Sequence, residues 1–213
     1  MISIESKCDF CTEGYSGQLN AKFAAALCRR TRILLKDASF YVVPTISPIV
    51  TNHILLIPMS HVTSRPQLAP AEREAVTVAE KELRGLLASP ARSIVSFEHG
   101  IGEGAHGGCG VSHFHIHIMP LQHRIATKAL ELLRHAPLGH FMQDTFDLQP
   151  GDSYVYMRSD GDSTSSAMVR RGDFPSQYLR NLIEDAAGMD RTNWRDIVRS
   201  ELLHETLAAP HWT

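Results

Sequence analysis

The stretch His113–Met119 constrains the fold of this chain more than any other, because three histidines alternate there with large apolar residues. Strict alternation is typical of a half-buried β-strand, since successive strand side chains point to opposite faces. Phe114, Ile116 and Ile118 then share the core side of the strand. The histidines share the other side, with neighbours roughly 6.5–7 Å apart. The pattern therefore predicts a row of imidazoles that can flank one bound group.

A row of three histidines indicates a functional site, because exposed strand faces usually carry Thr, Lys or Glu. Residues 100–110 contain six glycines and lead directly into the histidines. Glycine lets backbone N–H groups approach a ligand closely and point at an anion. The sequence therefore predicts a phosphate-binding wall beside the histidines.

Composition excludes several classes of protein. The 213 residues, 43% of them hydrophobic and 21% charged, are enough for one substantial core, or one core with an appended subdomain. A formal net charge of −2 gives no basic surface for long nucleic acid. No apolar run approaches the ~18–20 residues of a membrane span, and the N-terminal residues lack the apolar centre of a signal peptide. We therefore expect a cytoplasmic protein without a membrane partner.

The remaining apolar patterns predict an α+β fold. Strands are expected at 39–43, 53–57 and 93–97, and a hairpin at 154–158 and 167–170. Helices are expected at 20–36, 70–89, 126–135, 175–187 and 193–207. Together these elements predict an antiparallel sheet of about five strands with helices packed on it, followed by a C-terminal hairpin and helical extension. We expect one domain over 1–125 and an extension over 126–213 that packs on the same core.

Cys8 and Cys11 form a Cys-x-x-Cys pair, which can present two thiolates to one ion from a tight turn. The spacing alone is compatible with half of a structural zinc site, with a redox pair and with two buried thiols. Cys28 lies on the apolar face of the helix expected at 20–36, so we expect it to be a small core residue.

Residues 113–119 resemble the histidine triad (HIT) motif, His-x-His-x-His-x-x with apolar x, at every position. Upstream, the order of elements typical of this family is matched by Val43-Pro44, Asn52-His53, Ile57-Pro58 and His61. The resemblance implies a HIT-like fold and a nucleotide or nucleotide-conjugate substrate. It also implies a homodimer, since small HIT proteins usually pair through the helix and strand next to the site, unless the C-terminal helices from residue 175 onward cover that surface.

The resemblance further implies a hydrolase or nucleotidyltransferase that cleaves at the α-phosphate of a nucleoside 5′-phosphoryl compound through a phosphohistidine. We assign the nucleophile to His115, because neutral imidazole is competent near pH 7. His117 is expected to share the developing charge or to orient His115. By position in the family pattern, substrate contacts are expected from Thr45, Glu98, His99, Gly108, Cys109 and Gly110.

HIT proteins with an N-terminal Cys-x-x-Cys complete a zinc site with a later histidine and the first histidine of the triad. Here the resemblance implies a closed, structural zinc site formed by Cys8, Cys11, His61 and His113. His53 is the rival of His61 for the third position. His113 is then a metal ligand rather than a catalyst.

The tail of the chain leaves a second function open. The segments Phe174-Pro-Ser-Gln-Tyr-Leu-Arg180 and Trp194-Arg195 loosely resemble the region that follows the histidines in CwfJ-like proteins. By that likeness the chain would be a non-catalytic nucleotide- or RNA-binding module. The intact triad favours an enzyme, since a binding module has no need of all three imidazoles, and the lack of net positive charge counts against RNA.

Overall fold

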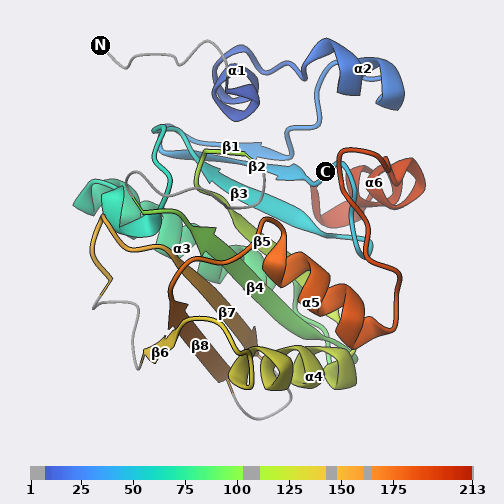
Figure 1. The fold of residues 1–213 in the computed structure, drawn as a ribbon. Coiled ribbons are helices and arrows are strands. Elements are labelled where there is room, and N and C mark those ends of the chain that lie inside the picture. The colour runs from blue at the N-terminus through green and yellow to red at the C-terminus, as the bar shows by residue number, and fades with distance from the viewer. Residues whose placement is uncertain (1–7, 103–110, 143–147, 161–164, 213) are drawn as a thin grey trace.

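The computed structural model describes residues 8–102, 111–142, 148–160 and 165–212. Within these residues, eight strands form one antiparallel sheet in the order β1-β2-β3-β5-β4-β7-β8-β6 (Figure 1). The predicted α+β class with an antiparallel sheet is confirmed. The sheet is larger than expected because the C-terminal hairpin extends it, through β7 paired with β4, and two short strands lie at its edges.

The strands are β1 (Leu35–Lys36), β2 (Phe40–Pro44), β3 (Ile54–Pro58), β4 (Ser93–Gly100), β5 (Ile116–Leu121), β6 (His140–Met142), β7 (Tyr154–Asp160) and β8 (Ser165–Arg171). The α-helices are α1 (Asp9–Ser16), α2 (Ala21–Leu27), α3 (Pro70–Leu87), α4 (His123–Arg134), α5 (Tyr178–Ala187) and α6 (Ser200–Leu207). None of the helices in the described part of the chain combines the length and apolarity that crossing a bilayer requires.

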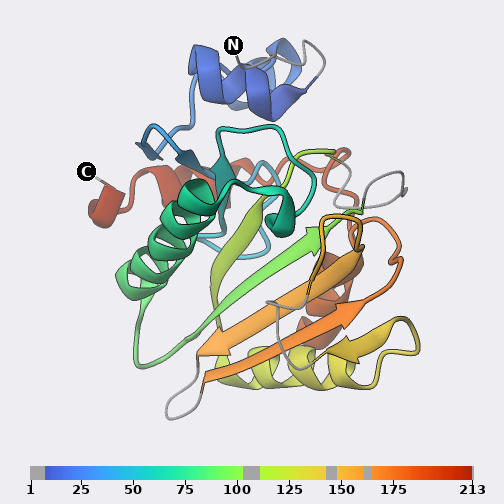
Figure 2. The same cartoon turned by 90° about the vertical axis from the view of Figure 1, so that its left-hand side faces the viewer.

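Helices cover both faces of the sheet, so the molecule has three layers (Figures 1 and 2). Helix α3 packs its apolar stripe, which includes Val76 and Leu83, against β3 and β5. Helices α4 and α5 pack on the opposite face, where Phe97 and Val95 of β4 meet Ile183 of α5. Because β4 and β5 are buried between these layers, polar side chains on them need partners inside the protein.

The histidine stretch forms a strand only from Ile116 onward, and residues 111–115 are irregular. The Phe114 N–H donates to Val62 O at 2.6 Å, which ties this segment to the loop after β3. The alternation is retained, because Phe114, Ile116 and Ile118 all pack on the α3 side. The expectation of a half-buried strand was wrong, since the histidines on the other face are buried as well.

Two helix expectations were too long. The helix at 20–36 ends at Leu27, because Cys28 adopts a left-handed conformation with φ 49° and closes the helix as its cap. Cys28 is exposed, so the expectation that it lies in the core was wrong. The last helix begins at Ser200 rather than near Asn193, and the preceding residues form an irregular segment held by side-chain contacts to α5.

Candidate active site and metal site

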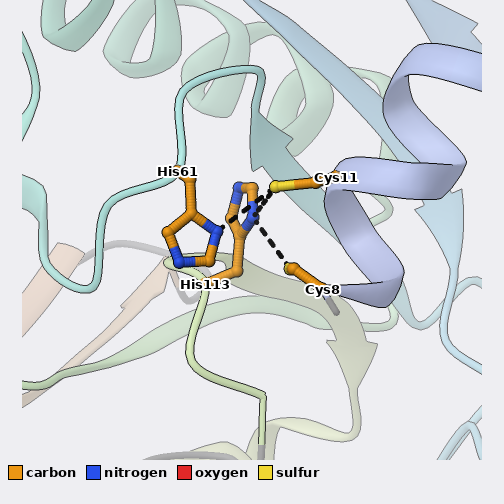
Figure 3. A group of neighbouring side chains, drawn as sticks. All are labelled: Cys8, Cys11, His61 and His113. Atoms are coloured by element: carbon orange, nitrogen blue, oxygen red, sulfur yellow. Dashed lines mark hydrogen bonds between the residues drawn. The ribbon is translucent and has the colours of Figure 1, made fainter. Parts of the chain in front are cut away.

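Four side chains from three parts of the chain converge beside the histidine stretch. Cys8 and Cys11 lie at the start of α1, His61 lies in the loop after β3, and His113 precedes β5 (Figure 3). Their ligand atoms all lie within 4.8 Å of one another. The Cys11 Sγ is 3.2 Å from His61 Nδ1, and both sulfur atoms are 3.5 Å from His113 Nδ1.

This donor set fits a tetrahedral metal ion. Zinc bonds of about 2.3 Å to sulfur and about 2.0 Å to nitrogen separate sulfur and nitrogen ligands by about 3.5 Å. The His113 Nε2–H donates to Pro58 O at 3.0 Å, so the lone pair of its Nδ1 points toward the two sulfur atoms. Metal-binding histidines are commonly oriented by such a carbonyl. The cluster could therefore bind a metal without rearrangement of His113.

His53 lies apart from the cysteines. Its Nδ1 accepts from the Ile49 N–H at 3.1 Å, and its Nε2 is 2.9 Å from His117 Nδ1. Because Nδ1 of His53 is an acceptor, its proton is on Nε2, which donates to His117. The structure thus brings His61, and not its rival His53, to Cys8 and Cys11.

His117 has the tautomer that this hydrogen bond selects. Its Nδ1 accepts from His53, so its proton is on Nε2, a buried atom with no hydrogen-bond partner among the described residues. The ring stacks on Phe97, with ring centroids 4.3 Å apart and planes 9° apart. Burial is the largest cause that lowers the pKa of His117 well below its ordinary value. His117 is therefore a fixed, neutral imidazole whose Nε2–H can donate to a ligand.

His115 has the opposite tautomer. Its Nδ1–H donates to the His113 carbonyl at 2.8 Å, which leaves the lone pair on Nε2. Burial lowers the pKa of His115 to about 4, so the ring is neutral at pH 7. The two rings lie beside each other, with centroids 5.0 Å apart. The site therefore combines one unprotonated imidazole nitrogen on His115 with one N–H donor on His117.

His115 and His117 line a pocket that opens to the surface. One part of its wall is apolar and includes Leu19, Phe23 and Ile46. The polar and aromatic side chains that share the pocket come from both ends of the chain, and they are Asp9, Glu13, Asn20, Arg32, Thr45, Gln177, Arg180 and Trp194. An apolar wall with a few polar groups is typical of a pocket for a small organic ligand.

Only some of the residues expected to contact the substrate lie in this pocket. Thr45 lines the pocket. His99 lies on the histidine face of β4, packs edge-on against Phe174, and has a buried Nδ1 without a hydrogen-bond partner among the described residues. Glu98 lies on the α3 side, where its carboxylate bonds to Arg65 and Tyr154. Gly108, Cys109 and Gly110 lie outside the described residues.

The pocket residues that the sequence did not predict include Arg32, Gln177, Arg180 and Trp194. Arg32 follows two other arginines in a segment that reads as exposed, yet its guanidinium is buried and pairs with both oxygens of Glu13 at 2.9 Å. The other three belong to the tail segments likened to CwfJ-like proteins. The likeness singled out these segments, but their spacing in the sequence does not predict that they lie next to the histidines.

Comparisons with known proteins agree with the triad. The sequence profile of the HIT domain matches residues 29–124. No curated protein matches the chain. Among solved structures, a hypothetical protein from Leishmania major is similar over 54% of this chain and 73% of its own, with 21% identity and a TM-score of 0.42.

Two further solved structures are similar at lower identity. A HIT family protein from Bacillus anthracis shares 18% identity over 55% of this chain and 74% of its own, with a TM-score of 0.40. Yeast Ap4A phosphorylase, solved in complex with AMP, shares 13% identity over 72% of this chain and 69% of its own, with a TM-score of 0.40. The domain match at residues 29–124 contains all three histidines of the motif. Residues 29–124 of this chain therefore match the HIT domain.

Proposed function

We propose that this protein is a nucleotidyl hydrolase or nucleotidyltransferase that cleaves at the α-phosphate of a nucleoside 5′-phosphoryl compound. One observation carries the proposal, namely the hydrogen bond from His115 Nδ1–H to the His113 carbonyl. That bond keeps the lone pair on Nε2, which is the atom a nucleophilic imidazole needs. A module that only binds nucleotides gains nothing from a histidine fixed in this tautomer.

In the proposed first step, the lone pair of His115 Nε2 forms a bond to the α-phosphorus, and the bond from phosphorus to the leaving oxygen breaks with its electron pair. His117 Nε2–H is a donor for a phosphoryl oxygen or for that leaving oxygen, which lowers the cost of the developing charge. Water or another acceptor then attacks phosphorus, the P–N bond breaks, and the pair returns to Nε2. The acceptor's proton balances the charge on the leaving group.

The pocket suits the nucleoside as well as the phosphate. Apolar side chains such as Leu19, Phe23 and Trp194 provide surface for a base, and Asn20 and Gln177 provide amide groups that can both donate and accept. Part of this wall comes from the proposed extension over 126–213, whose helices share a core with β4. We therefore propose that the domain over 1–125 and this extension build the substrate site together.

We propose that Cys8, Cys11, His61 and His113 hold a structural zinc ion. Bound zinc would supply a cross-link between α1, the loop after β3 and the residue that precedes β5. The carbonyl of His113 accepts from His115, so a fixed His113 also fixes the nucleophile. The proposed chemistry at phosphorus uses His115 and His117 only.

The test is release of nucleoside monophosphate from a panel of dinucleoside polyphosphates, nucleoside phosphoramidates and nucleotide sugars. His115→Ala should lower turnover by about 10³-fold or more, because removing a covalent nucleophile eliminates the two-step route. His204→Ala, at an exposed position on α6, is the matched control. If nucleotides bind but nothing in the panel is cleaved, the non-catalytic binding module replaces the enzyme.

A further inference from the structure

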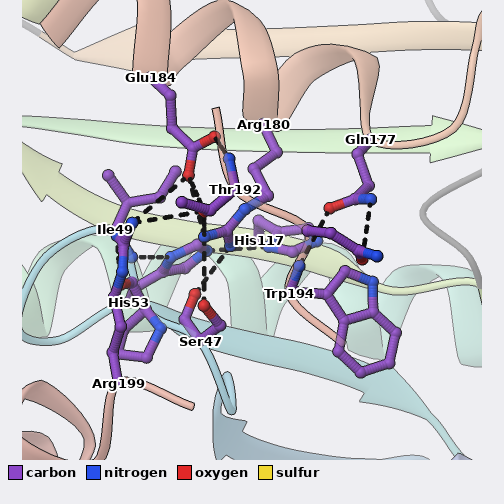
Figure 4. Close-up of polar contacts among 12 residues, drawn as sticks. Ser47, Ile49, His53, His117, Gln177, Arg180, Glu184, Thr192, Trp194 and Arg199 are labelled. Carbon is purple, nitrogen blue, oxygen red and sulfur yellow. Dashed lines mark hydrogen bonds and ion pairs between the residues drawn. The ribbon is translucent and has the colours of Figure 1, made fainter. Parts of the chain in front are cut away.

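Arg180 of helix α5 is a buried cation at the wall of the histidine pocket. Its side chain extends from α5 toward the loop between β2 and β3, beside His117 (Figure 4). It lines the same pocket as His115 and His117, and it is 4% exposed. Its guanidinium donates to Ser47 O at 2.7 Å and to Glu184 Oε1 at 3.0 Å. These contacts fix the position of its charge relative to the histidines.

A phosphate bound in this pocket needs nearby positive charge. Two of the neighbouring histidines, His53 and His117, do not supply it. His53 accepts at Nδ1 from a backbone N–H, and His117 accepts at Nδ1 from His53, so both rings are neutral. Phosphoryl transfer depends on fixed positive charge around the phosphoryl oxygens. Among the described residues that line the pocket, the permanent cations are Arg32 and Arg180.

The two arginines differ in how they hold their carboxylate partners. Arg32 pairs one-to-one with Glu13, using Nε and one terminal nitrogen on the two carboxylate oxygens at 2.9 Å. Arg180 shares one oxygen of Glu184 with Arg199, whose guanidinium lies 3.8 Å from that oxygen. A guanidinium group that shares its carboxylate with a second cation is a better partner for a further anion than one that holds a carboxylate alone.

We propose that Arg180 binds the phosphate of the substrate, so that the C-terminal segment supplies the cation of the histidine site. The inference rests on the proposed function, because it concerns the phosphate that His115 attacks. It assigns to this chain a preference for ligands that carry a 5′-phosphate over the same ligands without one. It also explains why Arg180 is held by Ser47, Glu184 and Thr192 rather than left to move.

Calorimetric titration of AMP, GMP, CMP and UMP, each beside its nucleoside, tests the assignment. Wild-type protein should bind at least one monophosphate more tightly than its nucleoside. Arg180→Gln, which keeps a polar side chain but no charge, should weaken binding of that monophosphate by about 10- to 100-fold and change nucleoside binding little. Arg180→Lys, which keeps the charge, should restore most of the preference. Arg191→Gln removes an exposed cation near the end of α5, outside the pocket, and should change neither.

The outcomes separate this inference from the proposed function. A folded Arg180→Gln protein that keeps the full preference overturns the role of Arg180 and leaves His115 untouched. Wild-type protein that binds nucleosides and monophosphates equally overturns both proposals. A crystal structure of the wild-type protein with AMP decides the question even if the variants do not fold, because a phosphate beyond reach of the Arg180 guanidinium refutes the assignment.

Discussion

Acid should unfold this protein, and His99 should account for a measurable part of that sensitivity. Burial lowers the pKa of His99 from 6.5 to about 4, with His115 adding to the shift and Asp173 opposing it. The folded state therefore holds His99 neutral, while the unfolded chain takes up a proton below pH 6.5. Stability is fully present above pH 6.5 and is lost as the pH falls toward 4, because the unfolded state then binds more protons.

The magnitude follows from the two pKa values. Between pH 7.5 and pH 5, a histidine that titrates at 6.5 when unfolded and at about 4 when folded loses about 2 kcal/mol of unfolding free energy. His53 and His117 are fully neutral by their hydrogen bonds, and burial lowers the pKa of both well below 6.5. Both therefore make the protein less stable as the pH falls, in the same direction as His99.

Urea unfolding at pH 7.5, 6.0 and 5.0, followed by tryptophan fluorescence, measures this dependence. In His99→Gln the fall in unfolding free energy between pH 7.5 and 5.0 should be about 2 kcal/mol smaller than in wild type. His204→Gln, at an exposed position, serves as the control. Equal pH dependence in wild type and His99→Gln would refute the argument that burial holds His99 neutral.

Three further outcomes are expected. Purified protein should contain about one zinc ion per chain, and Cys8→Ser should lower both the metal content and the melting temperature; zinc-free protein with unchanged melting would contradict the metal site. His117→Ala should slow turnover less than His115→Ala, because it removes a donor rather than the attacking atom, and steady-state kinetics would show the reverse order if the roles were exchanged. Sedimentation velocity should show a homodimer, and a monomer at micromolar concentration would mean that the C-terminal extension has replaced the partner.

Local patterns predicted much of the scaffold. The apolar stripe of α3, the β2–β3 pair and the β7–β8 hairpin follow from periodicity and turn residues, which depend only on neighbouring positions. The two-residue strand β1 and the three-residue strand β6 are too short to produce such a pattern. Their pairing depends on neighbouring strands that lie beside them only in the folded sheet.

In the candidate site too, some features could be predicted from the sequence, and others depend on contacts between distant parts of the chain. The convergence of Cys8, Cys11, His61 and His113 was expected from a resemblance that already contained their order in the chain. Arg180 could not be placed, because its position over His117 depends on how α5 packs across β4, a contact between residues more than 60 positions apart in the chain. The contacts of Glu98 were not predicted for a different reason, since its expected role came from its position in the family pattern and its partner Arg65 belongs to a separate turn.

The pairing of β4 with β7 has a consequence for how the chain becomes a folded protein. Along this pair Ile94 faces Asp160 and Gly100 faces Tyr154, so β4 is an interior strand only after residues 154–160 have been added to the sheet. A fragment that ends at residue 125 would leave the N–H and C=O groups of β4 open to a foreign strand, with Phe97 no longer covered by α5. During synthesis, the edge of β4 would remain unpaired and prone to aggregation until the β7–β8 hairpin has been made. Fragments cut at the end of the family match should therefore self-associate, whereas the full chain closes that edge itself.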